Sequence, residues 1–160
     1  LLSEVTYIKL GGPARLYVQL QKKEKVQELI QYALNEDIPF FILGKGCNVV
    51  FTDEGYDGII IRTELGVVEC IENNQIYAEA GVTLLDVIFV GHRCGLTGME
   101  NLSGVPSSLG GALFGNAGAG GSEISDFVHS VDVLEFDRKS KTSYAAALQH
   151  RTVLEFSSLR

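Results

Sequence analysis

The hydrophobic and polar positions in the first part of the chain follow two periods in turn. Residues 15–20 alternate between apolar and polar, which is the period of a strand with one buried face. Residues 22–36 place their apolar side chains at helical spacing, and residues 39–43 form a continuous apolar run that is typical of a buried strand. Strand, helix and strand in this order indicate a βαβ-like unit, and residues 58–62 predict a further strand.

The pattern further along predicts a hairpin and a capped helix. Two short strands, residues 67–72 and 75–79, flank an Asn–Asn pair, which favours a tight turn. Thr83 can cap a helix over residues 84–94, which the following glycine ends. Smaller elements are also expected: a strand over residues 49–51, a strand over 130–137, a polar turn over 137–141 and a short helix over 143–148.

Residues 95–123 interrupt these periods with nine glycines and one proline. Glycine at this density costs backbone entropy on folding, so it is kept where the chain turns at positive φ or approaches something closely. Apolar residues such as Leu109 and Leu113 lie inside the stretch, which argues against a flexible linker. We expect a buried loop and a short helix that let amides and glycine α-carbons touch a ligand.

Composition limits the class of protein. The 160 residues suit one domain or two small lobes, and the mean hydropathy of +0.16 indicates a well-buried soluble protein. A net charge of −7 without a basic stripe argues against a nucleic-acid partner. No apolar run approaches the ~20 residues that span a bilayer, and the first residues lack the pattern of a signal peptide. We therefore expect no membrane association.

The cysteines and histidines show no metal or disulfide pattern. Cys47, Cys70 and Cys94 are scattered and odd in number, which predicts reduced thiols in a cytosolic protein. The three histidines have no metal spacing with each other or with the cysteines, so no metal site is expected.

Two segments carry candidate chemistry. Gly44, Lys45, Gly46, Cys47 and Asn48 directly follow a predicted buried strand. A glycine-rich turn in this position exposes successive amides that suit anionic oxygens, although a plain β-turn has the same pattern. The segment is neither a Walker A box nor a G-x-G-x-x-G fingerprint.

The second segment begins at Pro106, which presets φ for the first turn of a helix. Ser107 or Ser108 can cap this helix, and Gly110 and Gly111 remove side chains from one of its faces. A capped helix start beside a bare backbone suits a pyrophosphate, while tight helix packing without a ligand is the alternative. The small residues that follow, 116–121, would admit a flat ring against the backbone.

Four ordered blocks resemble the FAD-binding region of the UDP-N-acetylenolpyruvoylglucosamine reductases, also called UDP-N-acetylmuramate dehydrogenases. The blocks are residues 6–14, residues 43–58, the Ala80–Gly81 pair with its following helix, and residues 98–123. The resemblance implies an α+β fold, the FAD-binding module of the vanillyl-alcohol oxidase and p-cresol methylhydroxylase type. It implies a small α/β lobe over residues 1–64 and a larger α+β lobe over 65–160.

The resemblance also implies a site for non-covalent FAD. The glycine turn would lie on the pyrophosphate, the serines and glycines of the second segment along the pyrophosphate and ribityl chain, and the Asn116 turn near the flavin. The implied cofactor-binding residues are Leu43, Gly44, Lys45, Gly46, Cys47, Asn48, Val49, Pro106, Ser107, Ser108, Gly110, Gly111, Asn116, Ala117 and Gly118.

The family's reaction implies further partners. NADPH reduces FAD, and the reduced flavin passes hydride to UDP-N-acetylglucosamine enolpyruvate in cytoplasmic peptidoglycan precursor synthesis. Arg151 would lie by the flavin and the substrate as the one catalytic residue carried over; a surface charge is the alternative. The family's C-terminal substrate domain, with its proton-donating serine and its glutamate, has no counterpart in these residues. This chain alone is therefore expected to be inactive.

Two other functions remain open on the sequence. The chain could belong to a flavoprotein oxidoreductase of the same fold that acts on another substrate. It could also be a non-catalytic binding module with a degenerate pocket, because Cys47, Ser107 and Gly120 stand where the family has serine, glycine and an aromatic residue.

Overall fold

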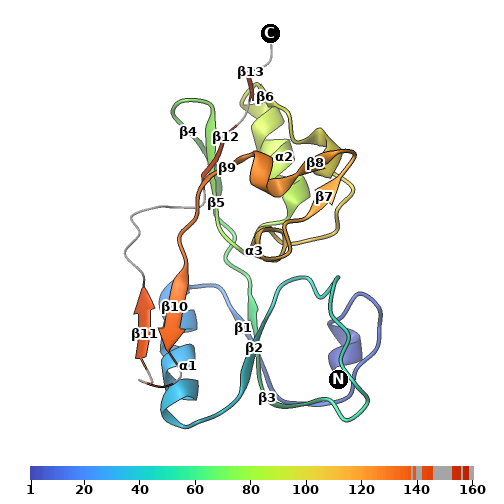
Figure 1. Ribbon diagram of the computed structural model, residues 1–160, viewed down its shortest axis with the longest axis vertical. Coiled ribbons are helices and arrows are strands. Elements are labelled where there is room, and N and C mark those ends of the chain that lie inside the picture. The colour runs from blue at the N-terminus through green and yellow to red at the C-terminus, as the bar shows by residue number, and fades with distance from the viewer. Residues whose placement is uncertain (138, 140–141, 146–152, 156, 159–160) are drawn as a thin grey trace. The chain divides into compact units, whose positions relative to one another are not determined.

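The computed structural model describes residues 1–137, 139, 142–145, 153–155 and 157–158 (Figure 1). The chain forms two compact units. The first comprises Leu1–Glu64 and Val133–Ala147, and the second comprises Leu65–Asp132 and Leu148–Arg160. Within the described residues, no helix combines the length and the apolarity needed to cross a bilayer.

The first unit is built on a parallel three-stranded sheet in the order β1-β3-β2. Strands β1 (Ala14–Leu20) and β2 (Phe40–Leu43) are joined through helix α1 (Lys23–Asn35), as the sequence predicts. Both strands run parallel to β3 (Tyr56–Thr63), which lies between them. The expected βαβ-like unit is therefore present, with a later strand inserted at its centre.

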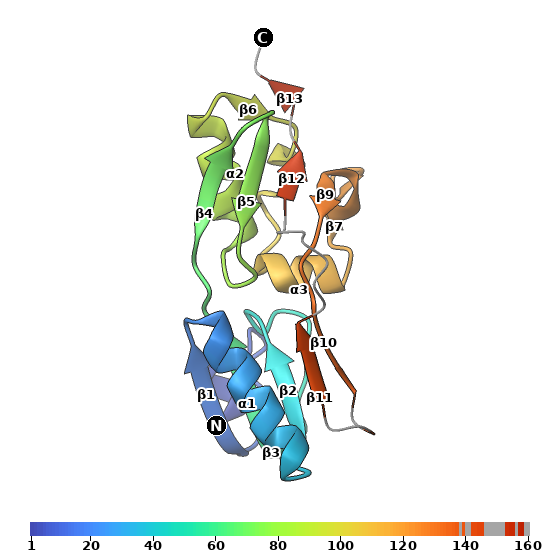
Figure 2. The ribbon, with the colours of Figure 1, turned by 90° about the vertical axis from the view of Figure 1, so that its left-hand side faces the viewer.

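The alternation of β3 divides the core of the first unit into two faces. Ile59 and Ile61 pack with the apolar side of α1, which lies across the sheet in Figure 2. Ile60 points the other way and packs with Leu2 and Leu43. All three isoleucines are buried, because the central strand has a neighbour on each side and a layer on each face.

Strand β2 is less buried than its apolar sequence predicts. Phe40 and Leu43 are buried, but Phe41 and Ile42 are 36% and 42% exposed. The reason is that β2 lies at the edge of the sheet, whereas a fully apolar run is typical of a central strand. The strand expected over residues 49–51 is also absent, and these residues form an irregular segment.

A strand replaces the helix that was expected from residue 143. Strands β10 (Leu134–Asp137) and β11 (Thr142–Ala145) form an antiparallel hairpin, and residues 146–148 lie outside the described part. Leu134 packs on the α1 core, and the ring of Phe136 meets that of Phe40 edge-on at 5.1 Å. Pairing with a strand that is anchored in this way outweighs the helix propensity of the alanines.

The second unit contains a four-stranded antiparallel sheet in the order β4-β5-β12-β9. Its strands are β4 (Val68–Ile71), β5 (Gln75–Ala78), β12 (Val153–Glu155) and β9 (Val128–Ser130). Asn73 and Asn74 join β4 to β5 with φ of 61° and 59°, which is the backbone of a type I′ turn. The strand expected over residues 130–137 is divided into β9 and β10, which belong to different units.

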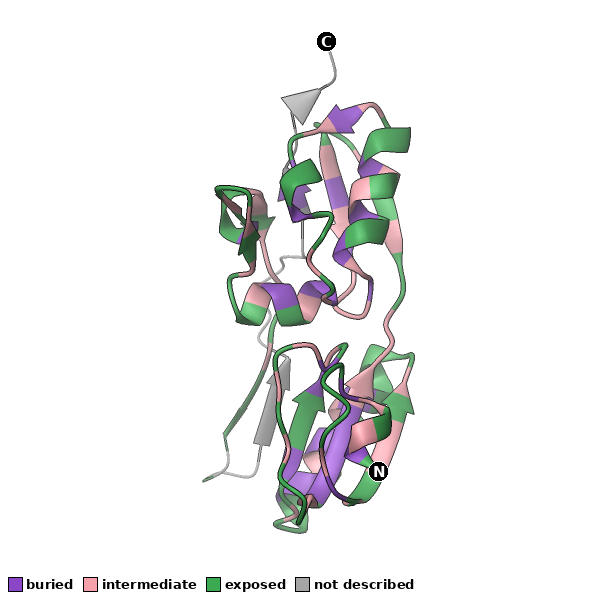
Figure 3. Ribbon diagram, turned by 90° about the vertical axis from the view of Figure 1, so that its right-hand side faces the viewer, coloured by how far each residue is buried: buried purple, intermediate pink, exposed green. Residues whose placement is uncertain are grey.

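Helices and short strands complete the second unit. Helix α2 (Leu84–Arg93) begins as expected, because the Thr83 side chain accepts a hydrogen bond from the Asp86 amide. Leu84 and Val87 of this helix are fully buried in a core shared with β5 and β12. Figure 3 colours the ribbon by the burial of each residue. The remaining elements are α3 (Leu109–Phe114), β6 (Leu96–Thr97) paired with β13 (Ser157–Ser158), and β7 (Gly118–Ala119) paired with β8 (Ser122–Glu123).

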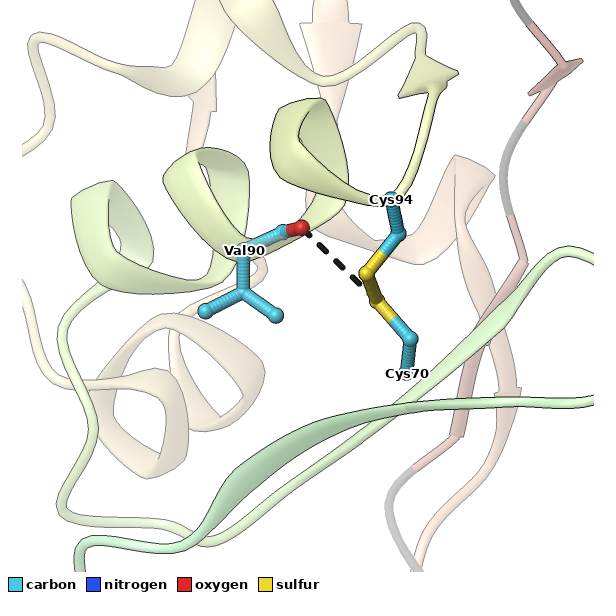
Figure 4. The surroundings of a disulfide bond; sticks show 3 residues. All are labelled: Cys70, Val90 and Cys94. Atoms are coloured by element: carbon cyan, nitrogen blue, oxygen red, sulfur yellow. Dashed lines mark hydrogen bonds between the residues drawn. A yellow bond between two sulfur atoms is a disulfide. The ribbon is translucent and has the colours of Figure 1, made fainter.

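Cys70 and Cys94 form a disulfide, so the expectation of three reduced thiols is wrong for these two (Figure 4). Cys70 lies on β4, and Cys94 directly follows α2, which packs on β4. The packing brings their Cα atoms to 6.6 Å, within the range that a disulfide requires. The 24 residues between them in sequence conceal this proximity.

Candidate functional site

The glycine turn after β2 presents unpaired amides. Among the described residues, the backbone N–H groups of Gly44, Lys45, Gly46 and Asn48 donate to no acceptor. Successive amides that point out of one turn form a concave donor site for anionic oxygens. These four amides could hold anionic oxygens, as the anion-binding interpretation of the turn requires.

The position of this turn depends on the N-terminal segment. The Tyr7 amide donates a 2.9 Å hydrogen bond to the Gly46 carbonyl. Gly46 has φ of +70°, and a Cβ at this position would lie 2.6 Å from the Val5 carbonyl oxygen. Only glycine fits this backbone and this approach, so two of the sequence blocks meet here in space.

Positive charge surrounds the turn. The cations of Lys45 and Arg62 act on the Cys47 thiol, although partial burial outweighs them and raises the Cys47 thiol pKa. Cys47 is consequently a neutral, small polar side chain and not a thiolate nucleophile. Lys45 is exposed, whereas Arg62 Nε lies 3.6 Å from the Glu64 carboxylate in an ion pair, so Lys45 is the cation more available to a diffusing anion.

The start of α3 differs from its expected role, because its first amides already have acceptors. Leu109 N–H donates to Val82 O at 2.7 Å, and Gly110 N–H donates to Ala80 O at 2.9 Å. Gly111 N–H donates to the Oγ of the capping residue Ser108. The geometry does not support the idea that this short helix donates its first amides to a pyrophosphate.

The glycines and serines of this segment have packing roles. A Cβ on Gly110 would lie 2.9 Å from the Cβ of Ala80, so Gly110 allows the helix start to approach residue 80. A Cβ on Gly111 would meet the Oγ of Ser107 at 3.0 Å. Ser107 has no positive φ and donates through Oγ to Ser108 O, so a serine is accommodated without backbone strain.

The small-residue turn that begins at Asn116 is braced by polar side chains. Asn116 has φ of 43°; its Nδ2 donates to Glu123 Oε2 at 2.6 Å, and its Oδ1 accepts from Ser125 N–H. From the other side, Asn101 Nδ2 donates to Gly120 O at 3.3 Å and to a serine hydroxyl at position 122. These hydrogen bonds hold the hairpin of β7 and β8 in place, and Ala117 and Gly118 at its start have little or no side chain.

Sequence reasoning missed Asn101, Val82 and Ala80 as supports of these segments. Nothing in their local pattern identifies them, because each acts on residues about twenty or more positions away. The Glu100 carboxylate accepts hydrogen bonds from its neighbours in sequence. The Thr97 hydroxyl, which has the largest effect, and the Gly98 amide donate to it, and these bonds lower the Glu100 pKa. The catalytic candidate Arg151 lies outside the described residues.

Comparison with known proteins identifies the class. Residues 14–138 match the family described as FAD binding domain, and the chain belongs to this family. The expected α+β fold of the vanillyl-alcohol oxidase type is thereby confirmed, together with FAD as the cofactor class. The four unpaired amides of residues 44–48, flanked by Lys45 and Arg62, fit the anionic pyrophosphate of such a cofactor.

The relatives confirm the more particular resemblance. A UDP-N-acetylenolpyruvoylglucosamine reductase of Lactobacillus acidophilus is 39% identical over 142 residues, which cover 88% of this chain and 47% of that protein. The enzyme of the same name from Listeria monocytogenes is 38% identical over 160 residues, covering 96% and 53%. The chain thus spans about half the length of the curated relatives it matches.

Solved structures agree at the level of fold. A UDP-N-acetylenolpyruvylglucosamine reductase from Thermus caldophilus superposes with a TM-score of 0.73 at 24% identity, covering 100% of this chain and 62% of that one. CrmK, a flavoenzyme of caerulomycin biosynthesis, gives 0.67 at 15% identity, covering 94% and 32%. A cholesterol oxidase from Brevibacterium sterolicum gives 0.66 at 13% identity, covering 89% and 34%.

Proposed function

We propose that the chain is the FAD-binding part of a UDP-N-acetylmuramate dehydrogenase. In this proposal an NADPH-dependent reductase converts UDP-N-acetylglucosamine enolpyruvate to UDP-N-acetylmuramate in cytoplasmic peptidoglycan precursor synthesis. The observation that carries it is the turn after β2, where the amides of Gly44, Lys45, Gly46 and Asn48 donate to no acceptor among the described residues, in a chain whose family binds FAD and whose relatives bear this enzyme's name.

Each unit would hold one part of the cofactor. The turn from Leu43 to Val49 would bind the pyrophosphate through backbone amides, with Lys45 supplying charge. The segment from Pro106 to Gly111 would contact the ribityl chain through side chains and carbonyls, because its first helical amides are already paired. The turn at Asn116, Ala117 and Gly118 would lie beside the flavin ring.

The chemistry would be divided between the cofactor and the protein. When bound, FAD would supply hydride-transfer chemistry between NADPH and the substrate double bond. This chain would bind and orient FAD, and Arg151 would hold negative charge of the substrate near the flavin. The proton donor and the substrate-binding groups would belong to the half of the relatives' length that this chain does not span.

Flavin binding is the first test. Purified protein titrated with FAD should acquire the yellow absorbance of oxidised flavin and quench flavin fluorescence at one equivalent. A protein that remains colourless at saturating FAD would overturn the proposal. The second test is NADPH oxidation by the full-length gene product in the presence of the enolpyruvyl UDP-sugar.

A second candidate is a flavoprotein oxidoreductase that acts on another substrate. The observation in its favour is that flavoenzymes as different as CrmK and cholesterol oxidase share this fold. A full-length protein that binds FAD and oxidises NADPH, but shows no acceleration with the enolpyruvyl UDP-sugar, would support this alternative.

A further inference from the structure

The disulfide between Cys70 and Cys94 is accessible from one side. Cys94 is exposed at the end of α2, and Cys70 is half-buried on β4 (Figure 4). The Cys70 sulfur lies 3.7 Å from the Val90 carbonyl oxygen, so a Cys70 thiol has an acceptor ready. Because Cys94 is the more exposed of the two residues, we expect an external thiol to attack its sulfur, and the released Cys70 thiol would have the Val90 carbonyl as an acceptor.

The bond closes a loop that supports the glycine-rich segment. Residues 71–93, between the two cysteines, comprise β5, the connection after it and α2. That connection and the first residue of α2 pair with residues 107–110 through three backbone hydrogen bonds, which we call the ladder. Leu84 N–H donates to Ser107 O at 3.2 Å, Leu109 N–H to Val82 O at 2.7 Å, and Gly110 N–H to Ala80 O at 2.9 Å.

We propose that the Cys70–Cys94 disulfide is a redox-responsive brace for this ladder. The oxidised bond holds β4 to the end of α2, limits the motion of the enclosed connection and so keeps residues 107–110 in place. Reduction leaves the fold intact but loosens the ladder. The consequence for flavin retention rests on the proposed function, because residues 107–110 are part of the proposed FAD site.

A small dithiol can reduce the Cys70–Cys94 disulfide in a balanced thiol–disulfide exchange, in which the dithiol itself becomes a disulfide. A thiolate of the reductant attacks the Cys94 sulfur, the sulfur–sulfur bond breaks, and Cys70 leaves as a thiolate that takes up a proton. The second thiol of the reductant resolves the mixed disulfide, which frees Cys94 as a thiol and oxidises the reductant to its disulfide. The proposed cytoplasmic location supplies such couples, and an exposed bond there is exchangeable rather than permanent.

The thiol count and amide exchange test the brace directly. Protein equilibrated with oxidised dithiothreitol, which forms no stable mixed disulfide with a single thiol, should label at one of its three cysteines, Cys47, and protein reduced with dithiothreitol should label at all three. Reduction should speed hydrogen exchange of the Leu109 and Gly110 amides by about tenfold or more. The Ile60 amide in the first unit should not change and serves as the internal control.

Cysteine variants distinguish the loss of the Cys70–Cys94 disulfide from other effects of the reductant. Cys70→Ser and Cys94→Ser should each match the reduced protein, with a thermal midpoint about 5–10 °C below that of the oxidised protein and no response to dithiothreitol. FAD should dissociate several-fold faster from the reduced protein and from both variants. Three labelled cysteines under oxidising conditions, or equal exchange of Leu109 and Gly110 in both states, would overturn the brace.

The outcomes for the brace and for the proposed function are distinguishable. Protein that binds no FAD but retains the exchange difference would refute the proposed function and support the brace. Protein that binds FAD with equal exchange and equal dissociation in both redox states would refute the brace and support the proposed function.

Discussion

The Gly46 carbonyl accepts a 2.9 Å hydrogen bond from the amide of Tyr7, which joins the N-terminal segment to the glycine turn. This bond holds the Gly46 carbonyl, while the amides of Gly44, Lys45 and Asn48 donate to no acceptor in the part of the chain that the structure describes. Gly46 is itself buried, with the Val5 carbonyl against its α-carbon. The position of the glycine turn thus depends on a contact between segments about forty residues apart.

Replacing Gly46 by alanine should destabilise the first unit. The new Cβ would lie 2.6 Å from a backbone oxygen at φ of +70°, so we expect a loss of about 2–4 kcal/mol in the free energy of unfolding. Urea denaturation followed by circular dichroism measures it. Gly104→Ala is the matched control, since nothing lies within 4 Å of its Cβ position, and it should change stability by less than about 0.5 kcal/mol. Equal effects at both sites would contradict this account.

Gly110→Ala should be destabilising for a reason unrelated to a ligand. Its Cβ would press on the Ala80 Cβ at 2.9 Å and on the Ala80 carbonyl oxygen at 3.2 Å, which we expect to cost about 1–3 kcal/mol. The second change Ala80→Gly removes the first of these contacts and should restore part of the loss. A double-mutant cycle by chemical denaturation without FAD measures the coupling, and strict additivity would refute the packing role.

Lys45→Glu should weaken FAD binding while leaving the fold unchanged. Lys45 is exposed beside the unpaired amides, so reversing its charge places a carboxylate near the proposed pyrophosphate site. We expect the Kd for FAD to rise about tenfold at low salt, and less at high salt, by fluorescence titration. Lys23→Glu on α1 makes the same change of net charge elsewhere, and its Kd should stay near that of the unmodified protein. Similar losses for both variants would remove Lys45 from the site.

Stability near Glu100 should depend on pH. Its pKa is lowered in the folded protein, so its contribution is present above the unfolded pKa and is lost as pH falls through the folded pKa. Thr97→Val removes the largest cause, the hydroxyl hydrogen bond. The variant should therefore be less stable than the unmodified protein at pH 7, with the difference in thermal midpoint shrinking on acidification below pH 4. A constant difference across this range would contradict the assignment.

Tyr17→Phe should be neutral or stabilising. The Tyr17 hydroxyl is buried in the core of the first unit and has no hydrogen-bond partner among the described residues. Removing it should change the free energy of unfolding by between zero and about 1 kcal/mol in the stabilising direction. Tyr17→Ala, which also removes the ring, should instead destabilise by about 3 kcal/mol. A loss of more than 1 kcal/mol in the phenylalanine variant would show that the hydroxyl has a partner.

Local pattern was sufficient for elements whose stability is itself local. The apolar stripe of α1, the Thr83 cap of α2 and the Asn73–Asn74 turn are all recognisable from neighbouring residues, because helix caps and tight turns are satisfied within a few positions. The glycine turn after β2 was recognisable for the same reason. The ordered family blocks then identified the cofactor, which no single turn could do.

Tertiary structure decided the relationships between distant segments. Ala145 lies in a strand because β10 offers a paired edge, and Cys70 meets Cys94 because α2 packs on β4. The two glycine segments look alike in sequence, but the amides of Gly44, Lys45, Gly46 and Asn48 donate to no acceptor among the described residues, whereas Val82 and Ala80 accept from the amides of Leu109 and Gly110 at the start of α3. The sequence alone determined that this chain belongs with the flavin-binding proteins. Which amides face a ligand depended on acceptors far along the chain, and only the folded backbone brings these into hydrogen-bonding distance.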